Sequence, residues 1–260
     1  MALPSMKHVE PTKLTKNSRF KFRCHKGVQC FTQCCSQINI LLTPYDIICM
    51  KKRLGMTSEE FLEKYTTMDI EEKTSHPFVM LKMLDTEGKP CPFVTPEGCT
   101  IYKDRPANCR YYPIGQASLR KGGEQGPEHE EFYFFIREPH CLGYQEDAEW
   151  TIESWMQDQG VDRYDEMNRE WKEIQLRRNL PGAALDSNKQ AQIYTACYDM
   201  DRFRRFVFES RFLDIFDISQ EEREKVRTDD IALMQLGVKY VKYVLMLEET
   251  LKVKEEHKKK

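Results

Sequence analysis

The chain has 260 residues, a length that suits one large domain or two of moderate size. Hydrophobic residues make up 40% and aromatic residues 11%, which is enough for a packed core and argues against wholesale disorder. The 40 Lys and Arg residues nearly balance the 42 Asp and Glu residues, which disfavours a globally basic nucleic-acid binder. No apolar run approaches the ~18 residues of a membrane span, so the sequence excludes an integral membrane protein.

Residues 1–23 are predicted to form a basic arm. Six of them are Lys or Arg, and Glu10 is the one acidic residue among them. Such an arm could bind a nucleic acid or an acidic partner, but a solvated leader is the simpler interpretation. We therefore expect no nucleic-acid partner, while a protein partner stays open.

Helix signals follow a short predicted strand at 36–42, where apolar residues alternate. The pair Thr43-Pro44 predicts a helix start, with Thr as the N-cap, and Gly55 predicts the end of that helix. The capping-box spacing of Thr57-Ser-Glu-Glu60 opens a second, short helix.

The middle of the chain changes character. Residues 77–114 are rich in Pro and Gly, and the apolar segments 78–82 and 100–102 predict small strands joined by tight loops. We expect residues 120–131 to be a flexible polar loop and 132–136 to be a buried strand.

From about Trp150 the pattern becomes helical. Apolar residues three or four positions apart predict helices across 164–174 and 231–245, and 188–213 predicts one long helix. These apolar stripes favour core packing over a cofactor pocket. The predicted fold class is α+β, mainly helical, with a small irregular antiparallel sheet in a cysteine-rich metal-binding module. The predicted regions are the arm at 1–23, the cysteine module at 24–145, and a helical region at 146–260 that packs on it.

The ten cysteines are the unusual feature of the chain. The N-terminus lacks the apolar stretch of a secretory signal, so we expect a cytoplasmic protein, where structural disulfides are rare. Clustered cysteines in that compartment favour metal ligation or redox chemistry. Cys49 and Cys197 lie inside helical patterns and are predicted to be buried apolar residues. The predicted metal ligands are the other eight: Cys24, Cys30, Cys34, Cys35, Cys91, Cys99, Cys109 and Cys141.

Thiolates are soft ligands that suit zinc, iron and iron–sulfur clusters rather than magnesium or calcium. Eight thiolates suffice for two four-thiolate sites, or for one site with supporting thiols. The chain has no C-x2-C pair, which structural zinc sites often use, whereas iron–sulfur clusters tolerate varied spacing, so the spacing favours iron slightly. The side chains of adjacent Cys34 and Cys35 should diverge, so we expect them to serve different metals, or only one of them to bind.

Charged residues next to the cysteines have more than one interpretation. His25 and His140 could substitute as ligands, although a surface or hydrogen-bonding role is simpler for each. Arg105 and Arg110 flank Cys109 and could offset the negative charge of a thiolate site. They could equally bind an anionic ligand or form ordinary surface ion pairs.

At these residues the chain resembles the YkgJ-type cysteine-cluster family of zinc- or iron-chelating proteins. The resemblance covers residues 20–145 and implies metal chelation by the matched cysteines. A flagellin lysine methylase family is similar in its cysteine block. The resembling elements are Cys24, Cys30 and Cys34-Cys35 before the Leu-Thr-Pro-Tyr-Asp-Ile helix start, then the block from Cys91 to Pro113, and finally Cys141-Leu-Gly143.

The function that we expect is a cytoplasmic metal-binding protein. Its clustered cysteine thiolates would chelate iron, alone or as an iron–sulfur cluster, with zinc as the alternative. A second hypothesis is a cluster-dependent enzyme, such as a protein lysine methylase that uses S-adenosylmethionine. A third is a thiol redox protein, which predicts exposed cysteines of low pKa and no stoichiometric metal. The sequence holds no dinucleotide loop, P-loop or radical-SAM spacing, so catalysis stays open.

Overall fold

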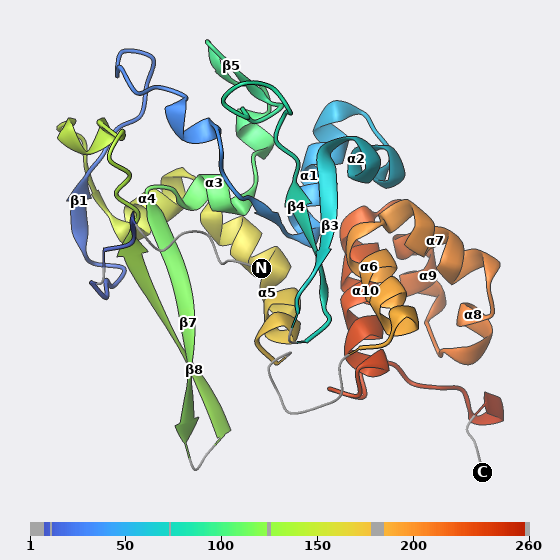
Figure 1. Ribbon diagram of the computed structural model, residues 1–260. Coiled ribbons are helices and arrows are strands. Elements are labelled where there is room, and N and C mark those ends of the chain that lie inside the picture. The colour runs from blue at the N-terminus through green and yellow to red at the C-terminus, as the bar shows by residue number, and fades with distance from the viewer. Residues whose placement is uncertain (1–7, 11, 73, 124–125, 178–184, 258–260) are drawn as a thin grey trace. The chain divides into compact units, whose positions relative to one another are not determined.

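The computed structural model describes residues 8–10, 12–72, 74–123, 126–177 and 185–257. Helices dominate and the sheets are small and antiparallel, so the predicted α+β class is confirmed (Figure 1). The chain forms two compact units that interleave along the sequence. Unit 1 takes the chain up to Ile40 together with Lys82–Asp165, and unit 2 takes Leu41–Leu81 and the chain from Glu166 onward.

This interleaving differs from the three consecutive regions that the sequence suggested. The chain leaves unit 1 after Ile40 and returns at Lys82, so the two helices expected inside the cysteine module belong to unit 2. The segment Leu41–Leu81 forms a three-stranded sheet and two helices within unit 2. Motifs taken in chain order do not reveal this arrangement. The boundaries predicted for a metal-binding module remain a prediction.

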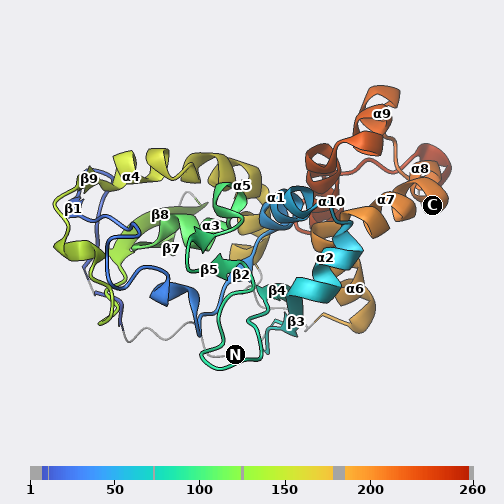
Figure 2. The same cartoon turned by 90° about the horizontal axis from the view of Figure 1, so that it is seen from above.

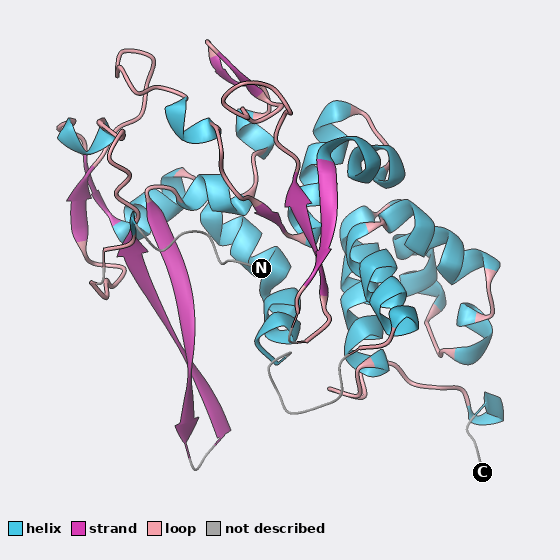
Figure 3. Cartoon of the chain, viewed as in Figure 1, coloured by secondary structure: helices cyan, strands magenta, loops and turns pink. Residues whose placement is uncertain are grey.

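Unit 1 contains three two-stranded antiparallel sheets and short helices (Figure 3). Its strand pairs are β1 (Arg19–Lys21) with β9 (Glu149–Thr151), β5 (Val94–Thr95) with β6 (Gly98–Cys99), and β7 (Ile114–Gly123) with β8 (Gly126–Phe135). Its helices are η2 (Gln33–Cys35), η3 (Tyr102–Asp104), α3 (Ala107–Tyr111), η4 (Gly143–Gln145), α4 (Ile152–Asp158) and the first residues of α5 (Val161–Arg177).

The long β7–β8 hairpin corrects the prediction of a polar loop at 120–131 (Figure 1). The ladder continues until Gly123 lies opposite Gly126. Backbone hydrogen bonds between two strands do not require apolar side chains, so a polar composition is compatible with strands here. The expected strand at 100–102 is also absent among the described residues, because the hairpin formed by β5 and β6 ends at Cys99 and η3 begins at Tyr102.

Aromatic residues of the predicted arm lie in the core of unit 1. Phe20 and Phe22 are buried, and the ring of Phe22 packs edge-on against Trp155 at 5.5 Å between centroids. This part of the arm is therefore not a solvated leader, because alternate residues of β1 point into the core. Residues 1–7 and 11 of the predicted arm lie outside the described residues.

Unit 2 combines a three-stranded antiparallel sheet with a group of helices. The sheet has the order β2 (Leu41–Leu42), β4 (Pro77–Leu81), β3 (Thr66–Ile70). Helix α10 packs against α1, α6, α7 and α9, as Figure 2 shows. Its helices are α1 (Pro44–Leu54), α2 (Ser58–Tyr65), most of α5, α6 (Ser187–Tyr198), α7 (Met200–Glu209), α8 (Phe212–Ile215), α9 (Gln220–Thr228), α10 (Asp230–Val244) and η5 (Glu255–His257). None of the helices in the described ranges combines the length and hydropathy that a membrane crossing requires.

Local capping signals predicted helix ends well in unit 2. Thr43 and Thr57 each form the expected capping box, and Gly55 ends α1 in the left-handed conformation. The single helix expected at 188–213 is wrong, because Asp199 interrupts it and its carboxylate accepts a hydrogen bond from the N–H of Arg202 at the start of α7. The strand expected at 36–42 is reduced to Leu41–Leu42.

A buried polar network joins α2 to α7 within unit 2. The fully buried hydroxyl of Ser58 lies 2.7 Å from Asp199 Oδ1 and 2.8 Å from Asp201 Oδ2. Lys51 Nζ lies 3.5 Å from Asp201 Oδ2. Burial alone would raise the pKa of Asp201, but the hydrogen bonds from Ser58 and the charge of Lys51 outweigh it and lower that pKa.

Replacing Asp201 by Asn should destabilise the protein by about 1–3 kcal/mol at neutral pH, because Ser58 and Lys51 lose an ionised acceptor. A lowered pKa in the folded state means that the carboxylate stabilises the fold above its unfolded pKa. This contribution is lost as the pH falls from that value toward the folded pKa. Denaturant unfolding at several pH values should therefore show that wild type and Asp201→Asn converge in acid. The exposed Asp217→Asn variant is the control, and an equal effect of both substitutions would contradict the prediction.

Candidate metal centre

The first cysteine group begins where backbone pairing joins residues 22–23 to the segment that follows Cys141. Phe22 N–H donates to the carbonyl of Ala148 at 2.9 Å, and Arg23 N–H donates to that of Gly143 at 3.0 Å. A Cβ on Gly143 would lie 2.7 Å from the ring of Phe22, so this close approach requires glycine. The pairing brings Cys24, next along the chain, to the same region as Cys141.

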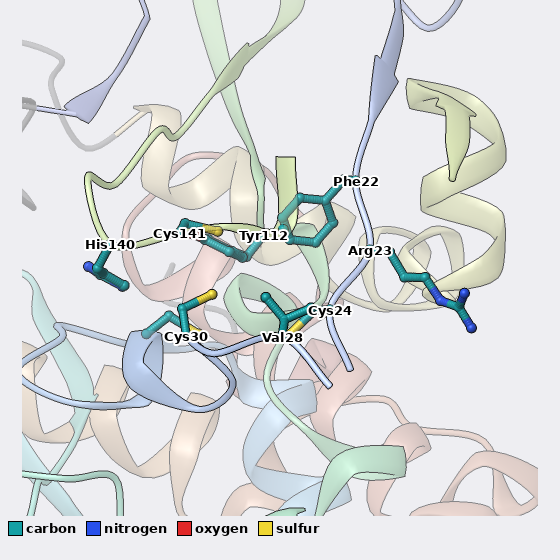
Figure 4. A pocket seen from close by; sticks show the side chains of 10 residues that line it. Phe22, Arg23, Cys24, Val28, Cys30, Tyr112, His140 and Cys141 are labelled. Carbon is teal, nitrogen blue, oxygen red and sulfur yellow. The ribbon is translucent and has the colours of Figure 1, made fainter. Parts of the chain in front are cut away.

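Four thiols line one cavity of unit 1, and three of them are labelled in Figure 4. The backbone N–H of Leu142 donates to the sulfur of Cys30 at 3.1 Å, a bond that favours a thiolate at this position. In Figure 4 the sulfurs of Cys30 and Cys141 point toward the space beside Tyr112, whereas Arg23 points away. The cysteines of this group, named here the first group, are Cys24, Cys30, Cys34 and Cys141.

Tyr112 is a residue of this cavity that the sequence did not single out as a site residue. Its hydroxyl donates to Glu138 Oε2 at 3.2 Å, and burial together with the neighbouring Cys141 raises the pKa of this phenol. His140 lines the cavity, but its Nε2 lies 3.4 Å from Glu138 Oε2. His25 Nε2 pairs with Glu146 at 3.0 Å. Both histidines therefore have carboxylate partners, and their part in metal binding stays a prediction.

The second cysteine group forms around a short backbone pairing between residues 35–37 and 89–91. Cys91 N–H donates to the carbonyl of Cys35 at 2.8 Å, and Gln37 N–H donates to that of Lys89 at 3.0 Å. These bonds place two cysteines that are 56 positions apart in the sequence side by side. The β5–β6 hairpin then pairs Val94 with Cys99, which returns the chain toward Cys91.

Backbone N–H groups favour ionisation of two thiols of this second group. Those of Phe93 and Val94 act to lower the pKa of Cys91, and that of Ile101 acts to lower the pKa of Cys99, in each case against the larger effect of burial. Such donors stabilise negative charge on sulfur and therefore suit a bound thiolate. Cys109 lies in α3, and Arg105 interacts electrostatically with both Cys99 and Cys109. We define the second group as Cys35, Cys91 and Cys99, which interact with one another, together with Cys109, which is linked to Cys99 through Arg105.

Cys34 and Cys35 connect the two groups. Cys34 lines the first cavity, whereas Cys35 interacts electrostatically with Cys91 and Cys99 and also with Cys24 of the first group. The two adjacent thiols affect each other's ionisation, since Cys35 raises the pKa of Cys34 and Cys34 lowers the pKa of Cys35. Their division between different metals stays a prediction.

Burial is the main influence on most of these thiols. It raises the pKa of Cys91 to about 11, and desolvation of the sulfur raises the pKa of Cys24 to about 11 although that residue as a whole is exposed. The pKa of Cys99 is also raised by burial, against the opposing effects of the Ile101 N–H and of Arg105. Protonated thiols at neutral pH must lose their protons to bind a metal. Within the described residues, no three His, Cys, Asp or Glu side chains stand together as a ready-made ion site.

Arg105 and Arg110 are not surface residues. Each is only 7% exposed, and both hydrogen-bond backbone carbonyls near α3. The interpretation of these arginines as ordinary surface ion pairs is therefore wrong, because both side chains are buried. Cys49 and Cys197, which were expected to take no part, belong to unit 2, whereas all eight predicted ligands belong to unit 1.

The burial differences predict an order of thiol alkylation in the native protein. Cys24 is exposed, whereas Cys197 is 1% exposed and burial raises its pKa to about 12. Iodoacetamide should modify Cys24 early and Cys197 only when the protein unfolds. Peptide mass spectrometry after timed alkylation, with and without a metal chelator, measures both rates. Equal rates for Cys24 and Cys197 in folded protein would contradict the assigned burial.

Comparison with known proteins identifies one family and nothing more specific. Residues 23–142 match the CxxCxxCC family, whose description is "Putative zinc- or iron-chelating domain". No curated protein and no solved structure matches the chain. The match spans every cysteine of both groups and stops one residue after Cys141. The chain is thus similar to the CxxCxxCC family over residues 23–142, a little under half of its length.

Proposed function

We propose that this protein binds metal in two four-thiolate sites. The first group, Cys24, Cys30, Cys34 and Cys141, would hold one centre, and the second group, Cys35, Cys91, Cys99 and Cys109, would hold the other. The proposal joins the family's metal chemistry to the local arrangement of the thiols. Bound there, a metal would crosslink remote segments of unit 1 and, as an iron–sulfur cluster, would also carry electrons.

The observation that carries this proposal is the separation of the cysteines between the units. Eight cysteines from remote segments gather in unit 1, and each group brings together thiols from both of its chain segments. The two cysteines without predicted roles lie in unit 2. Random burial of small apolar residues would not sort them in this way.

Hydrogen bonding supports a thiolate site in each group. In the first group the N–H of Leu142 donates to the sulfur of Cys30, and in the second group nearby backbone N–H groups act to lower the pKa of Cys91 and Cys99. These donors offset part of the charge that four thiolates bring to one centre. Soft sulfur donors suit both iron and zinc. We favour iron, as an iron–sulfur cluster, because the ligand spacing lacks the C-x2-C pairs of structural zinc, which remains the alternative.

The thiol-redox hypothesis receives less support. A reactive thiol needs a low pKa and access to solvent. Desolvation raises the pKa of Cys24, Cys91 and Cys99, whereas the pKa of half-buried Cys35 is lowered by its neighbour Cys34. The methylase hypothesis rests on the similar cysteine block alone. Both remain predictions.

Metal analysis of cysteine variants tests the proposal. Protein purified without oxygen should contain iron and sulfide and absorb near ~400 nm, or should be colourless and contain zinc. Cys30→Ser and Cys99→Ser should each lose about half of the metal, because each disrupts a different site. The double variant should lose nearly all of it.

Controls for this experiment lie in unit 2. Cys49→Ala and Cys197→Ala should keep the full metal content, even if the buried Cys197→Ala lowers stability. Folded wild-type protein without stoichiometric metal would refute the proposal. Complete metal loss in either single ligand variant would instead indicate one shared centre.

Raised thiol pKa values predict a strong pH dependence of metal retention. Protons compete with the metal for Cys24 and Cys91, so affinity should fall as the pH drops below the pKa of about 11 of each thiol. The decrease can reach about tenfold per thiolate for each pH unit. Competition against a chelator of known pH-dependent affinity, between pH 8 and pH 6, measures it. A flat profile would show that the ligands are not these thiols.

A further inference from the structure

Two buried arginines adjoin the second cysteine group without a carboxylate partner. Arg105 donates to the carbonyl of Tyr102 at 2.6 Å and to the side-chain oxygen of Gln159. Its guanidinium lies 3.9 Å from the centre of the Tyr102 ring. Every partner in these contacts is electrically neutral.

Arg110 is bound in the same way. It donates to the carbonyl of Arg105 at 3.0 Å, to that of Gln159 at 2.7 Å, and to that of Lys103. It also donates to the hydroxyl of Tyr164 at 3.0 Å, and its guanidinium lies 4.1 Å from the centre of that ring. Among the described residues, neither arginine forms an ion pair with a carboxylate, and their shared partner Gln159 donates to exposed Asp158 at 2.7 Å.

Burying two charges without counter-ions is costly. Hydrogen bonds to carbonyls satisfy the N–H groups but do not neutralise the charge, and an unpaired buried ion carries a penalty of several kcal/mol. Arg105 and Arg110 also lie close to each other. Burial lowers the pKa of Arg105, and repulsion from Arg110 lowers it further. A fold that keeps both arginines buried therefore needs negative charge close by.

The second cysteine group can supply that charge once its thiols are ionised. Arg110 directly follows Cys109 in α3, and Arg105 interacts electrostatically with Cys99 and Cys109. Thiols are neutral, but four thiolates around a divalent ion, or around a [4Fe–4S]²⁺ cluster, carry a net charge of about −2. Two guanidinium groups match this charge.

We propose that Arg105 and Arg110 are built-in counter-ions for a dianionic four-thiolate centre held by Cys35, Cys91, Cys99 and Cys109. This inference rests on the proposed function and adds the net charge of the centre and the two residues that balance it. Both arginines are positioning residues, and Gln159 holds them together, since its side chain binds one and its backbone carbonyl binds the other. The first group has no equivalent among its labelled neighbours, because Arg23 points away from it (Figure 4).

The test compares affinity and stability in the Arg105→Gln and Arg110→Gln variants of the full chain. Each should weaken metal retention at the second site by about tenfold or more in chelator competition with zinc or ferrous iron. Metal-free protein should unfold at the same temperature as wild type or higher, because an uncompensated charge is gone. Loaded protein should unfold at a lower temperature. If the centre is an iron–sulfur cluster, its reduction potential should also become more negative.

Matched substitutions separate charge from packing. Arg105→Lys and Arg110→Lys keep the charge but lose most of the hydrogen bonds, so they should retain metal far better than the Gln variants. Arg23→Gln removes an exposed charge beside Cys24 and should leave affinity unchanged. Cys30→Ser in each background removes the contribution of the first site.

The outcomes are distinguishable. Equal destabilisation of metal-free and loaded protein with unchanged affinity would show a purely structural role and overturn the inference. The inference would also be overturned if the Lys variants bound metal as weakly as the Gln variants, or if both kinds of variant failed to fold. If only the Gln variants fail to fold and the Lys variants bind normally, the charge is essential, as proposed. Wild-type protein that binds no metal would instead overturn the proposed function.

Discussion

Two short stretches of antiparallel backbone pairing in unit 1 determine where the cysteines lie. One joins residues 22–23 to the segment from 143 to 148, and the other joins 35–37 to 89–91. Each closes a loop of 50 residues or more, measured along the sequence. Such closure costs conformational entropy that grows slowly with loop length, and a metal crosslink between the same segments would offset part of it. The aromatic packing of Phe22 against Trp155 anchors the first of these pairings.

The buried thiols and the buried arginines of unit 1 have complementary electrostatic requirements. Buried thiols resist ionisation, as the raised pKa values of Cys24 and Cys91 indicate, while buried Arg105 and Arg110 carry charge without carboxylate partners in the described chain. A cation favours ionisation of the thiols, and thiolates in turn favour the buried guanidinium groups. A thiolate-bound metal therefore removes two energetic costs that the protein alone retains.

Sequence patterns predicted local features better than distant ones. The caps at Thr43 and Thr57 depend on side chains three residues apart, so their motifs were sufficient. The eight cysteines stood out by composition and spacing, and the structure places them in one unit. In contrast, the division into groups depends on pairings between remote segments, which spacing does not encode. The burial of Phe20 and Phe22 was not predicted because basic residues surround them in the sequence. The β7–β8 ladder was not predicted because its sequence is polar. The neutral partners that leave Arg105 and Arg110 without a counter-ion are likewise visible only in three dimensions.

The coordination sphere of the bound metal tests the central claim most directly. X-ray absorption spectroscopy at the iron and zinc edges of anaerobically purified protein reports the atoms bound to the metal. The account predicts a first shell of sulfur alone at ~2.3 Å, with four sulfur neighbours for each metal atom. A first shell that is mainly oxygen or nitrogen, or the absence of both metals from folded protein, would contradict it.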